Sequence, residues 1–71
     1  SLLSDKRIAP VLSKLLLEDP LPEIRILATE SLVTLNDKTV IDDIMRSIKE
    51  EKNVEVRKKS AWAYSKLKYN K

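Results

Sequence analysis

The chain contains 71 residues with a formal net charge of +3, and it has no cysteine, histidine or glycine. These absences remove the thiol nucleophile, the imidazole base, the usual zinc ligands and the glycine-rich phosphate loop, so we expect no enzyme activity, no cofactor and no metal site. A domain of this size buries only roughly 60% of the surface of its unfolded chain, and without disulfides or metals its stability must come from helix packing or association.

The hydrophobic pattern predicts an all-α protein without a membrane segment. Phenylalanine is absent, and β-branched residues nowhere alternate as a half-buried strand requires. Apolar runs such as Leu15 to Leu17 are far too short to cross a bilayer, and no leader resembles a signal peptide. We therefore expect a soluble, intracellular protein located in the cytoplasm.

A shift of 32 residues reveals an internal repeat. Seven of the 39 superposed positions are identical, among them Glu23 with Glu55 and Arg25 with Arg57. The apolar positions coincide as well: Ile8 with Val40, Leu12 with Ile44, Leu16 with Ile48 and Ile24 with Val56. Self-similarity at such a period indicates a repeat architecture, in which each unit is one supersecondary element.

The first helix is predicted at about residues 5–18. Pro10 lies near its start, where proline is tolerated. The apolar residues of this helix follow the spacing of a single buried face, which consists of Ile8, Val11, Leu12, Leu15 and Leu16.

The second helix is predicted at about residues 22–35. Pro20 and Pro22 close the first helix and open this one. The predicted buried stripe consists of Ile24, Leu27, Ala28, Ser31, Leu32 and Leu35. On a helical wheel, Ile26 and Val33 lie opposite this stripe.

The third helix is predicted at about residues 38–50. Asn36 tolerates the left-handed conformation that ends a helix, and Asp37 is a good N-cap for the next one. Asp42 and Asp43 are adjacent, but consecutive helical residues point about 100° apart and do not converge on one substrate atom. We interpret them as first-turn residues that favour the helix dipole. The apolar stripe consists of Val40, Ile41, Ile44, Met45 and Ile48.

The fourth helix is predicted at about residues 54–69, with Asn53 as its cap. It carries the positive charge of the chain. Residues 1–52 hold eight basic and ten acidic side chains, a net −2, whereas residues 53–71 hold six basic and one acidic, a net +5. Trp62 and Tyr69 are seven residues apart and share an outer face.

The segment from Glu18 to Arg25, followed by Ala28, Leu32 and Leu35, resembles the start of a HEAT-like repeat of the short type first recognised in phycobilisome lyases. The acidic residue before the turn, the proline and the apolar residue before arginine carry the resemblance. They recur as Glu51, the segment 53–55 and the pair Val56 and Arg57, while Leu21 and Lys59 depart from the pattern.

This resemblance implies one domain over residues 1–71, a right-handed α-α superhelix of four antiparallel helices. It also implies that Arg25 and Arg57 link the acidic turn residues of neighbouring units. The phase of the repeat makes residues 1–4 the tail of a preceding repeat helix and leaves the fourth helix without a following partner. We therefore expect a piece of a longer array, or a unit that is completed by another copy.

The outer apolar residues form the candidate partner-binding site. It consists of Ile26, Val33, Trp62 and Tyr69, and Trp62 is the expected anchor for a protein or peptide, because aromatic residues dominate binding energy at interfaces. The alternative is that neighbouring repeats or long lysine side chains cover these residues.

A second candidate site is the basic patch of the fourth helix, which consists of Arg57, Lys58, Lys59, Lys66 and Lys68. Basic and aromatic residues together can bind nucleic acid, whereas the competing interpretation is a solvated helix end. The first and third helices, which we expect to line the concave groove, present mixed charges, so nucleic acid is not the expected partner. The favoured function is a non-catalytic protein–protein interaction scaffold. A fragment of a phycobilin lyase-like protein is the other alternative.

Overall fold

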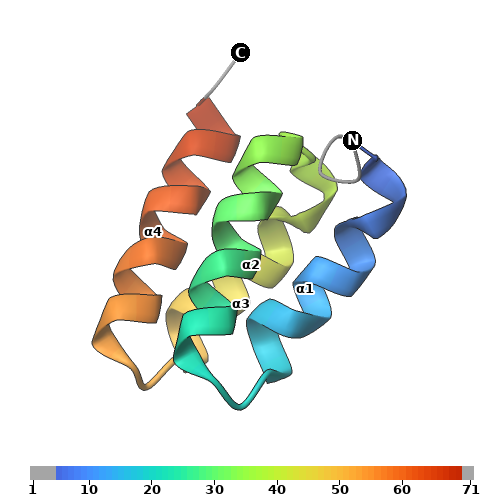
Figure 1. Ribbon diagram of the computed structural model, residues 1–71. Coiled ribbons are helices and arrows are strands. Elements are labelled where there is room, and N and C mark those ends of the chain that lie inside the picture. The colour runs from blue at the N-terminus through green and yellow to red at the C-terminus, as the bar shows by residue number, and fades with distance from the viewer. Residues whose placement is uncertain (1–4, 70–71) are drawn as a thin grey trace.

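The computed structural model describes residues 5–69, which form two antiparallel helical hairpins (Figure 1). The first hairpin consists of α1 (Ala9–Glu18) and α2 (Pro22–Leu35), and the second of α3 (Ile41–Glu50) and α4 (Val54–Tyr69). Short 3-10 turns, η2 (Lys6–Ile8) and η3 (Lys38–Val40), lead into α1 and α3. The predicted all-α class with four helices is confirmed. The predicted helix tail at residues 1–4 lies outside the described residues.

Turn residues set the helix boundaries. Pro22 lies in the first turn of α2, where its missing N–H is not needed. Asn36 ends α2 in the left-handed conformation, with φ of 54°, and its N–H donates to two carbonyls of the last turn. The Asn53 side chain accepts hydrogen bonds from the backbone N–H groups of Glu55 and Val56. The bounds of α2 and α4 therefore coincide with the ranges expected from the sequence.

The α-helical parts of the first and third helices begin later than the sequence ranges, because a 3-10 turn precedes each one. Asp5 and Asp37 occupy equivalent positions, and each accepts a hydrogen bond from the backbone N–H two residues later at 2.9 Å. Pro10 falls in the first turn of α1, where it costs no intrahelical hydrogen bond.

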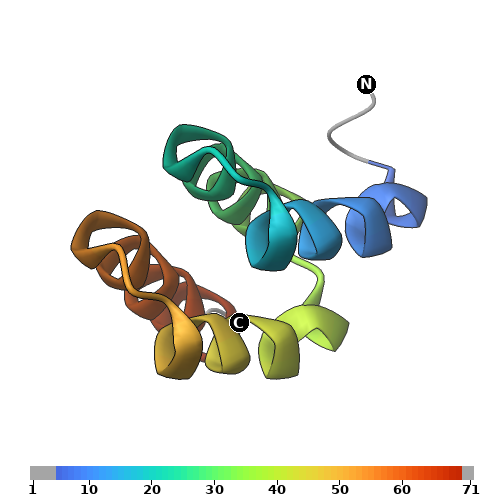
Figure 2. The same cartoon turned by 90° about the horizontal axis from the view of Figure 1, so that it is seen from below.

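The two hairpins stack side by side with their turns at the same end of the molecule (Figures 1 and 2). The connection through η3 lies at the opposite end. Within the stack, α2 packs extensively on both α1 and α4, whereas α1 and α3 share a smaller contact. The layer formed by α2 and α4 is therefore the more closely packed of the two.

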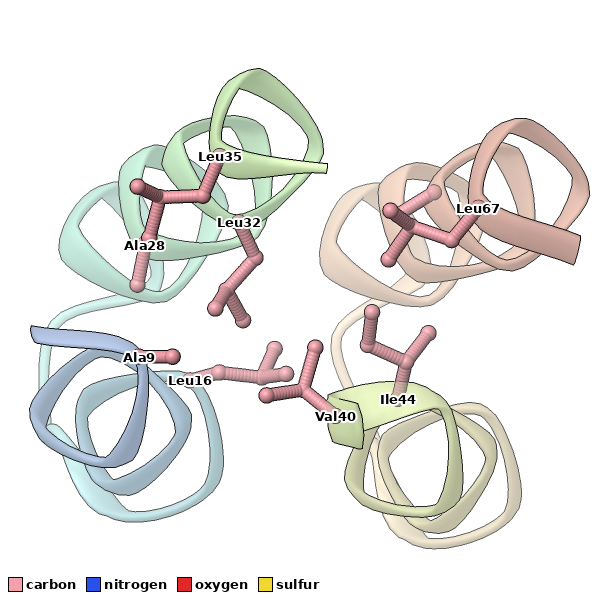
Figure 3. Packing of buried hydrophobic residues seen from close by; sticks show 9 residues of the cluster. Ala9, Leu16, Ala28, Leu32, Leu35, Val40, Ile44 and Leu67 are labelled. Carbon is pink, nitrogen blue, oxygen red and sulfur yellow. The ribbon is translucent and has the colours of Figure 1, made fainter. Parts of the chain in front are cut away.

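One hydrophobic core joins both hairpins, and side chains from all four helices meet in it (Figure 3). Leu16, Leu32, Ile44 and Leu67 come from four different helices, and each is fully buried. Completely burying a leucine or isoleucine stabilises the fold by about 1.5–3 kcal/mol relative to exposure. The remaining members of the buried cluster are Ala9, Ala28, Leu35, Val40 and Ala63.

The sequence predictions of burial are wrong for Val11 and Leu27, and Ile26 and Val33 are less exposed than expected. Val11 and Leu27 belong to the predicted stripes, yet they are 61% and 57% exposed because they face away from the second hairpin. Val33 was expected on an outer face, but it is half-buried and packs against the core. Val33 is covered because α2 contacts α1 and α4 on different sides, so more of the surface of α2 is buried than a single apolar stripe.

Candidate interaction surface

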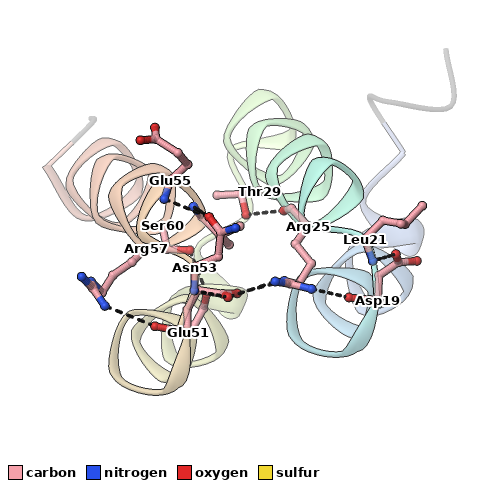
Figure 4. A network of polar contacts seen from close by, with 11 residues as sticks. Asp19, Leu21, Arg25, Thr29, Glu51, Asn53, Glu55, Arg57 and Ser60 are labelled. Atoms are coloured by element: carbon pink, nitrogen blue, oxygen red, sulfur yellow. Dashed lines mark hydrogen bonds and ion pairs between the residues drawn. The ribbon is translucent and has the colours of Figure 1, made fainter.

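Arg25 joins the two hairpins at the turn end of the molecule (Figure 4). Its Nε and Nη2 groups donate to the two carboxylate oxygens of Glu51 at 3.0 and 3.1 Å, and Nη1 donates to the backbone carbonyl of Asp19 at 2.7 Å. The side chains of Arg25 and Glu51 are only 16% and 9% exposed, so this bidentate pair is largely shielded from water. The predicted structural link between repeats is confirmed for these two residues.

The acidic turn residues also close their own turns. The Asp19 carboxylate accepts the backbone N–H of Leu21 at 2.9 Å, and the Glu51 carboxylate accepts that of Asn53 at 3.0 Å. Arg57 lies one repeat after the bridging arginine, and its Nη1 donates to the Glu51 carbonyl at 3.4 Å. Among the described residues no carboxylate forms an ion pair with Arg57. The arginine link is therefore complete between the hairpins and half-formed at the end of the stack.

A second ion pair ties α2 to α4 and leads to an exposed aromatic ring. The Lys59 ammonium lies 3.1 Å from the Glu30 carboxylate and 4.6 Å from the ring centroid of Trp62. This distance is within the range of a cation–π interaction. Trp62 is 39% exposed, so its indole is held from one side and open to solvent on another.

We refer to the surface around this ion pair as the α2–α4 face. Ile26 and Val33 flank Glu30 at helical spacings of four and three residues, which places them beside it on α2. Both are half-buried, so they contribute the apolar floor of this face more than its exposed surface. Tyr69 lies two turns beyond Trp62 on α4 and is 71% exposed.

Both hairpins match a known family of helical repeats. A family model described as HEAT repeats matches residues 9–71, which cover α1 to α4. The chain belongs to the HEAT repeat family. Comparison with curated proteins and with solved structures gives no match.

The curvature of a HEAT array follows from which helices pack more closely. In this pair α2 and α4 share the larger contact, so a stack continued in the same way bends toward them. The α2–α4 face is therefore on the inner side. The expectation that the first and third helices line the concave groove is opposite to this packing.

The basic residues of α4 do not form one patch in this HEAT pair. Lys59 bridges to α2, and Lys58 lies 3.8 Å from Glu55 on its own helix. Lys68 donates to the hydroxyl of Tyr64 at 2.9 Å. Arg57 and Lys66 lie on different sides of the helix, because nine residues correspond to a rotation of about 180°.

A surface cleft of about 380 Å³ lies beside the Arg25 and Glu51 pair. Its lining is mainly polar, with charged side chains from both turns. Within residues 5–69 no group of three acidic residues is placed to hold a metal ion, and no helix is long and apolar enough to cross a membrane.

The perturbed pKa values belong to local hydrogen bonds and not to a reactive site. The hydroxyl and backbone N–H of Thr39 lower the pKa of Asp37, which caps η3. The Arg7 side chain lowers the pKa of Asp5 in the same way. The Tyr64 hydroxyl raises the pKa of Lys68.

Two contacts were not predicted from the sequence. The hydroxyls of Ser47 and Ser60 form a buried hydrogen bond of 2.8 Å between α3 and α4. The Glu30 and Lys59 pair bridges α2 and α4. Opposite charges facing each other were a possible signal for the second contact, but only after the offset between parallel helices was known.

Proposed function

We propose that this HEAT repeat pair is a non-catalytic scaffold that binds a protein or peptide partner through the α2–α4 face. The observation that carries the proposal is the position of Trp62, which is exposed and held by Lys59 above the surface of α4. HEAT-type solenoids use their curved inner surfaces for binding, and the α2–α4 face is on the inner side.

The environment of Trp62 suits a binding anchor. Lys59 is fixed by Glu30, so the indole is oriented before any partner arrives. A pre-oriented ring loses little conformational freedom on binding, and tryptophan is enriched among the residues that dominate interface energies. Ile26 and Val33 add partly buried apolar area on α2 beside Glu30.

The charges of this face indicate the chemistry of the partner. Lys66 lies one turn beyond Trp62 and is exposed, and Lys58 is also exposed at the other end. A segment with one apolar side chain for the indole and acidic residues on either side fits this arrangement. Electrostatic complementarity of this kind orients a partner and speeds association.

Trp62 is the only tryptophan of the chain, so its fluorescence reports directly on the proposed contact. A displayed peptide library selected against the wild-type protein provides the probes, and titration of each selected peptide should shift the emission to shorter wavelength. Isothermal titration calorimetry should show at least about tenfold weaker binding for Trp62→Ala, and a smaller loss for Trp62→Phe.

Val54→Ala is the matched control, because Val54 is an exposed apolar residue at the start of α4. Peptides that bind Trp62→Ala and wild type equally well would contradict the proposal. Nucleic acid binding would instead appear as a steep loss of affinity with salt, and bilin binding as a change in visible absorption. Arg57 lies on the side of α4 opposite Lys66, so the predicted basic residues do not all face one ligand, which does not favour the first alternative. The cytoplasmic location expected from the sequence stays a prediction.

A further inference from the structure

The repeat symmetry shows what stacking covers in one hairpin and leaves open in the other. Leu16, Thr29 and Leu32 of the first hairpin are completely buried where the second hairpin packs on them. Their equivalents 32 residues later are not: Ile48 and Tyr64 are half-buried, and Ala61 is exposed. We refer to this surface as the trailing face, which consists of Ile41, Met45, Ile48, Arg57, Ala61 and Tyr64.

The first hairpin has the reciprocal surface. Ile44 and Val56 of the second hairpin are completely buried where they meet the first. Their equivalents Leu12 and Ile24 are only half-buried, and Leu27 is 57% exposed. We refer to this surface as the leading face, which consists of Ile8, Leu12, Leu15, Ile24 and Leu27. The two end faces thus carry the positions that fit together inside the molecule.

We propose that a second copy of this chain stacks end to end, with its leading face on the trailing face of the first. The interface between two copies would then repeat the interface between the two hairpins within one copy. The proposal concerns the ends of the stack and does not rest on the proposed function, but a stacked copy and a partner on the α2–α4 face would both contact Trp62.

The charged groups at the two ends are complementary. Arg57 already donates to the Glu51 carbonyl, as Arg25 does to the Asp19 carbonyl, and it lacks only the carboxylate among the described residues. In a stacked second copy, the residue equivalent to Glu51 is Asp19. The Asp19 carboxylate closes its turn through the same kind of backbone hydrogen bond, so it is oriented as Glu51 is.

The overall charge supports the same direction of stacking. Residues 5–35 carry four basic and five acidic side chains, a net −1, whereas residues 37–69 carry nine basic and six acidic, a net +3. Head-to-tail stacking brings these unlike hairpins together, while head-to-head stacking of the second hairpins brings like charges together.

Two exposed apolar residues also gain a partner. Within the molecule, Lys59 of the second hairpin meets Glu30 of the first. One repeat later, the equivalent positions are Leu27 of the second copy and Trp62 of the first copy. Both are large, exposed hydrophobic residues in the single chain. In the interface between two copies, these residues form an apolar contact at the position that the Glu30 and Lys59 ion pair occupies in the interface within the chain.

This contact is heterologous, so each added copy leaves a free end and the assembly does not close. Sedimentation of the wild-type chain should show an average mass that rises from 8.2 kDa with concentration and does not level off at two copies. A monomer at all concentrations up to about 1 mM, which corresponds to a negligible affinity, would overturn the proposal. A mass that stops at two copies would do the same, because it indicates a symmetric dimer.

Charge variants identify the surface. Arg57→Glu should weaken association at least about tenfold, while Arg46→Glu, on the exposed outer side of α3, should leave it unchanged. Asp19→Glu should strengthen association, because the chain itself shows that glutamate fits at the equivalent position 51. Equal association of the two arginine variants would contradict the proposal. Circular dichroism of each variant checks that the helices are intact.

A charge-swap experiment tests whether Arg57 of one copy contacts Asp19 of the next copy. Arg57→Asp and Asp19→Arg chains should each associate weakly alone and associate together when mixed, because the swapped pair restores the contact at one interface. Arg57→Glu should retain the binding of peptides selected against the α2–α4 face. Because Trp62 takes part in both contacts, the Arg57 and Asp19 variants are the ones that distinguish failure of the stacking model from failure of the proposed function.

Discussion

The guanidinium of Arg25 on α2 binds both carboxylate oxygens of Glu51 across the boundary between the hairpins, at 3.0 and 3.1 Å. The same arginine donates to the backbone carbonyl of Asp19, which follows the last residue of α1, so one side chain fixes the turn and the stacking together.

Arg25→Ala should therefore lower the free energy of unfolding by about 2 kcal/mol, because it leaves the shielded Glu51 carboxylate without its bidentate partner. Arg57→Ala is the matched control, since Arg57 is exposed and forms one long hydrogen bond, and it should cost less than about 0.5 kcal/mol. Urea denaturation of both variants, at concentrations where the chain is monomeric, gives the comparison. Equal losses would show that Arg25 contributes no more than a surface charge.

The buried hydroxyl pair predicts a non-additive double mutant. Ser47→Ala leaves the completely buried Ser60 hydroxyl without its partner, which should cost about 1–3 kcal/mol. Replacing both serines by alanine removes the orphaned group, so the double variant should be more stable than the less stable of the two single variants. Additive losses in thermal unfolding would mean that another group or a water satisfies the remaining hydroxyl.

Asp37 predicts a pH dependence of stability. Its pKa is lowered in the folded state by Thr39, so the carboxylate contributes stability that is fully present above the ordinary aspartate pKa. This contribution is lost as the pH falls below about 4 and through the folded-state pKa. Asp37→Asn keeps a capping oxygen without a titrating group, so its stability should fall less between pH 6 and pH 2. Asp37→Ala should cost about 1 kcal/mol at neutral pH. Parallel acid curves for wild type and Asp37→Asn would refute this assignment.

Truncating a side chain in the core should cost much more stability than truncating one on the open leading face. Leu32→Ala removes a completely buried side chain and should cost about 2–5 kcal/mol. Leu27→Ala, five residues earlier on the same helix, should change stability by no more than about 0.5 kcal/mol in the monomer. Guanidinium denaturation of dilute samples measures both. A large loss for Leu27→Ala would show that this side of α2 is covered in solution.

Local chemistry made the helices predictable from the sequence. Pro22, Asn36 and Asn53 each have a conformational or capping preference that acts over a few residues, so the bounds of α2 and α4 follow from them without tertiary information. The 32-residue repeat then implied that the hairpins stack. The link between Arg25 and Glu51 followed because it recurs at the repeat period and resembles the family pattern.

The surface was harder to predict because it depends on which neighbours are present. Leu27 and Leu32 look alike on a helical wheel, but only the second faces α4. Val33 looks exposed on the same wheel and is partly covered, because α2 is enclosed on two sides. The contact of Lys59 with Glu30 and Trp62 requires the exact offset of two parallel helices, which no local pattern encodes.

The two ends of the hairpin interface are held by different forces. At the turn end the hairpins meet through Arg25 and Glu51, whereas at the η3 end Leu35, Val40 and Leu67 pack in the core. Salt screens a shielded ion pair only weakly, whereas cooling weakens the burial of apolar side chains. Cold should therefore loosen the interface first at the η3 end, while the turn end stays joined even at high ionic strength.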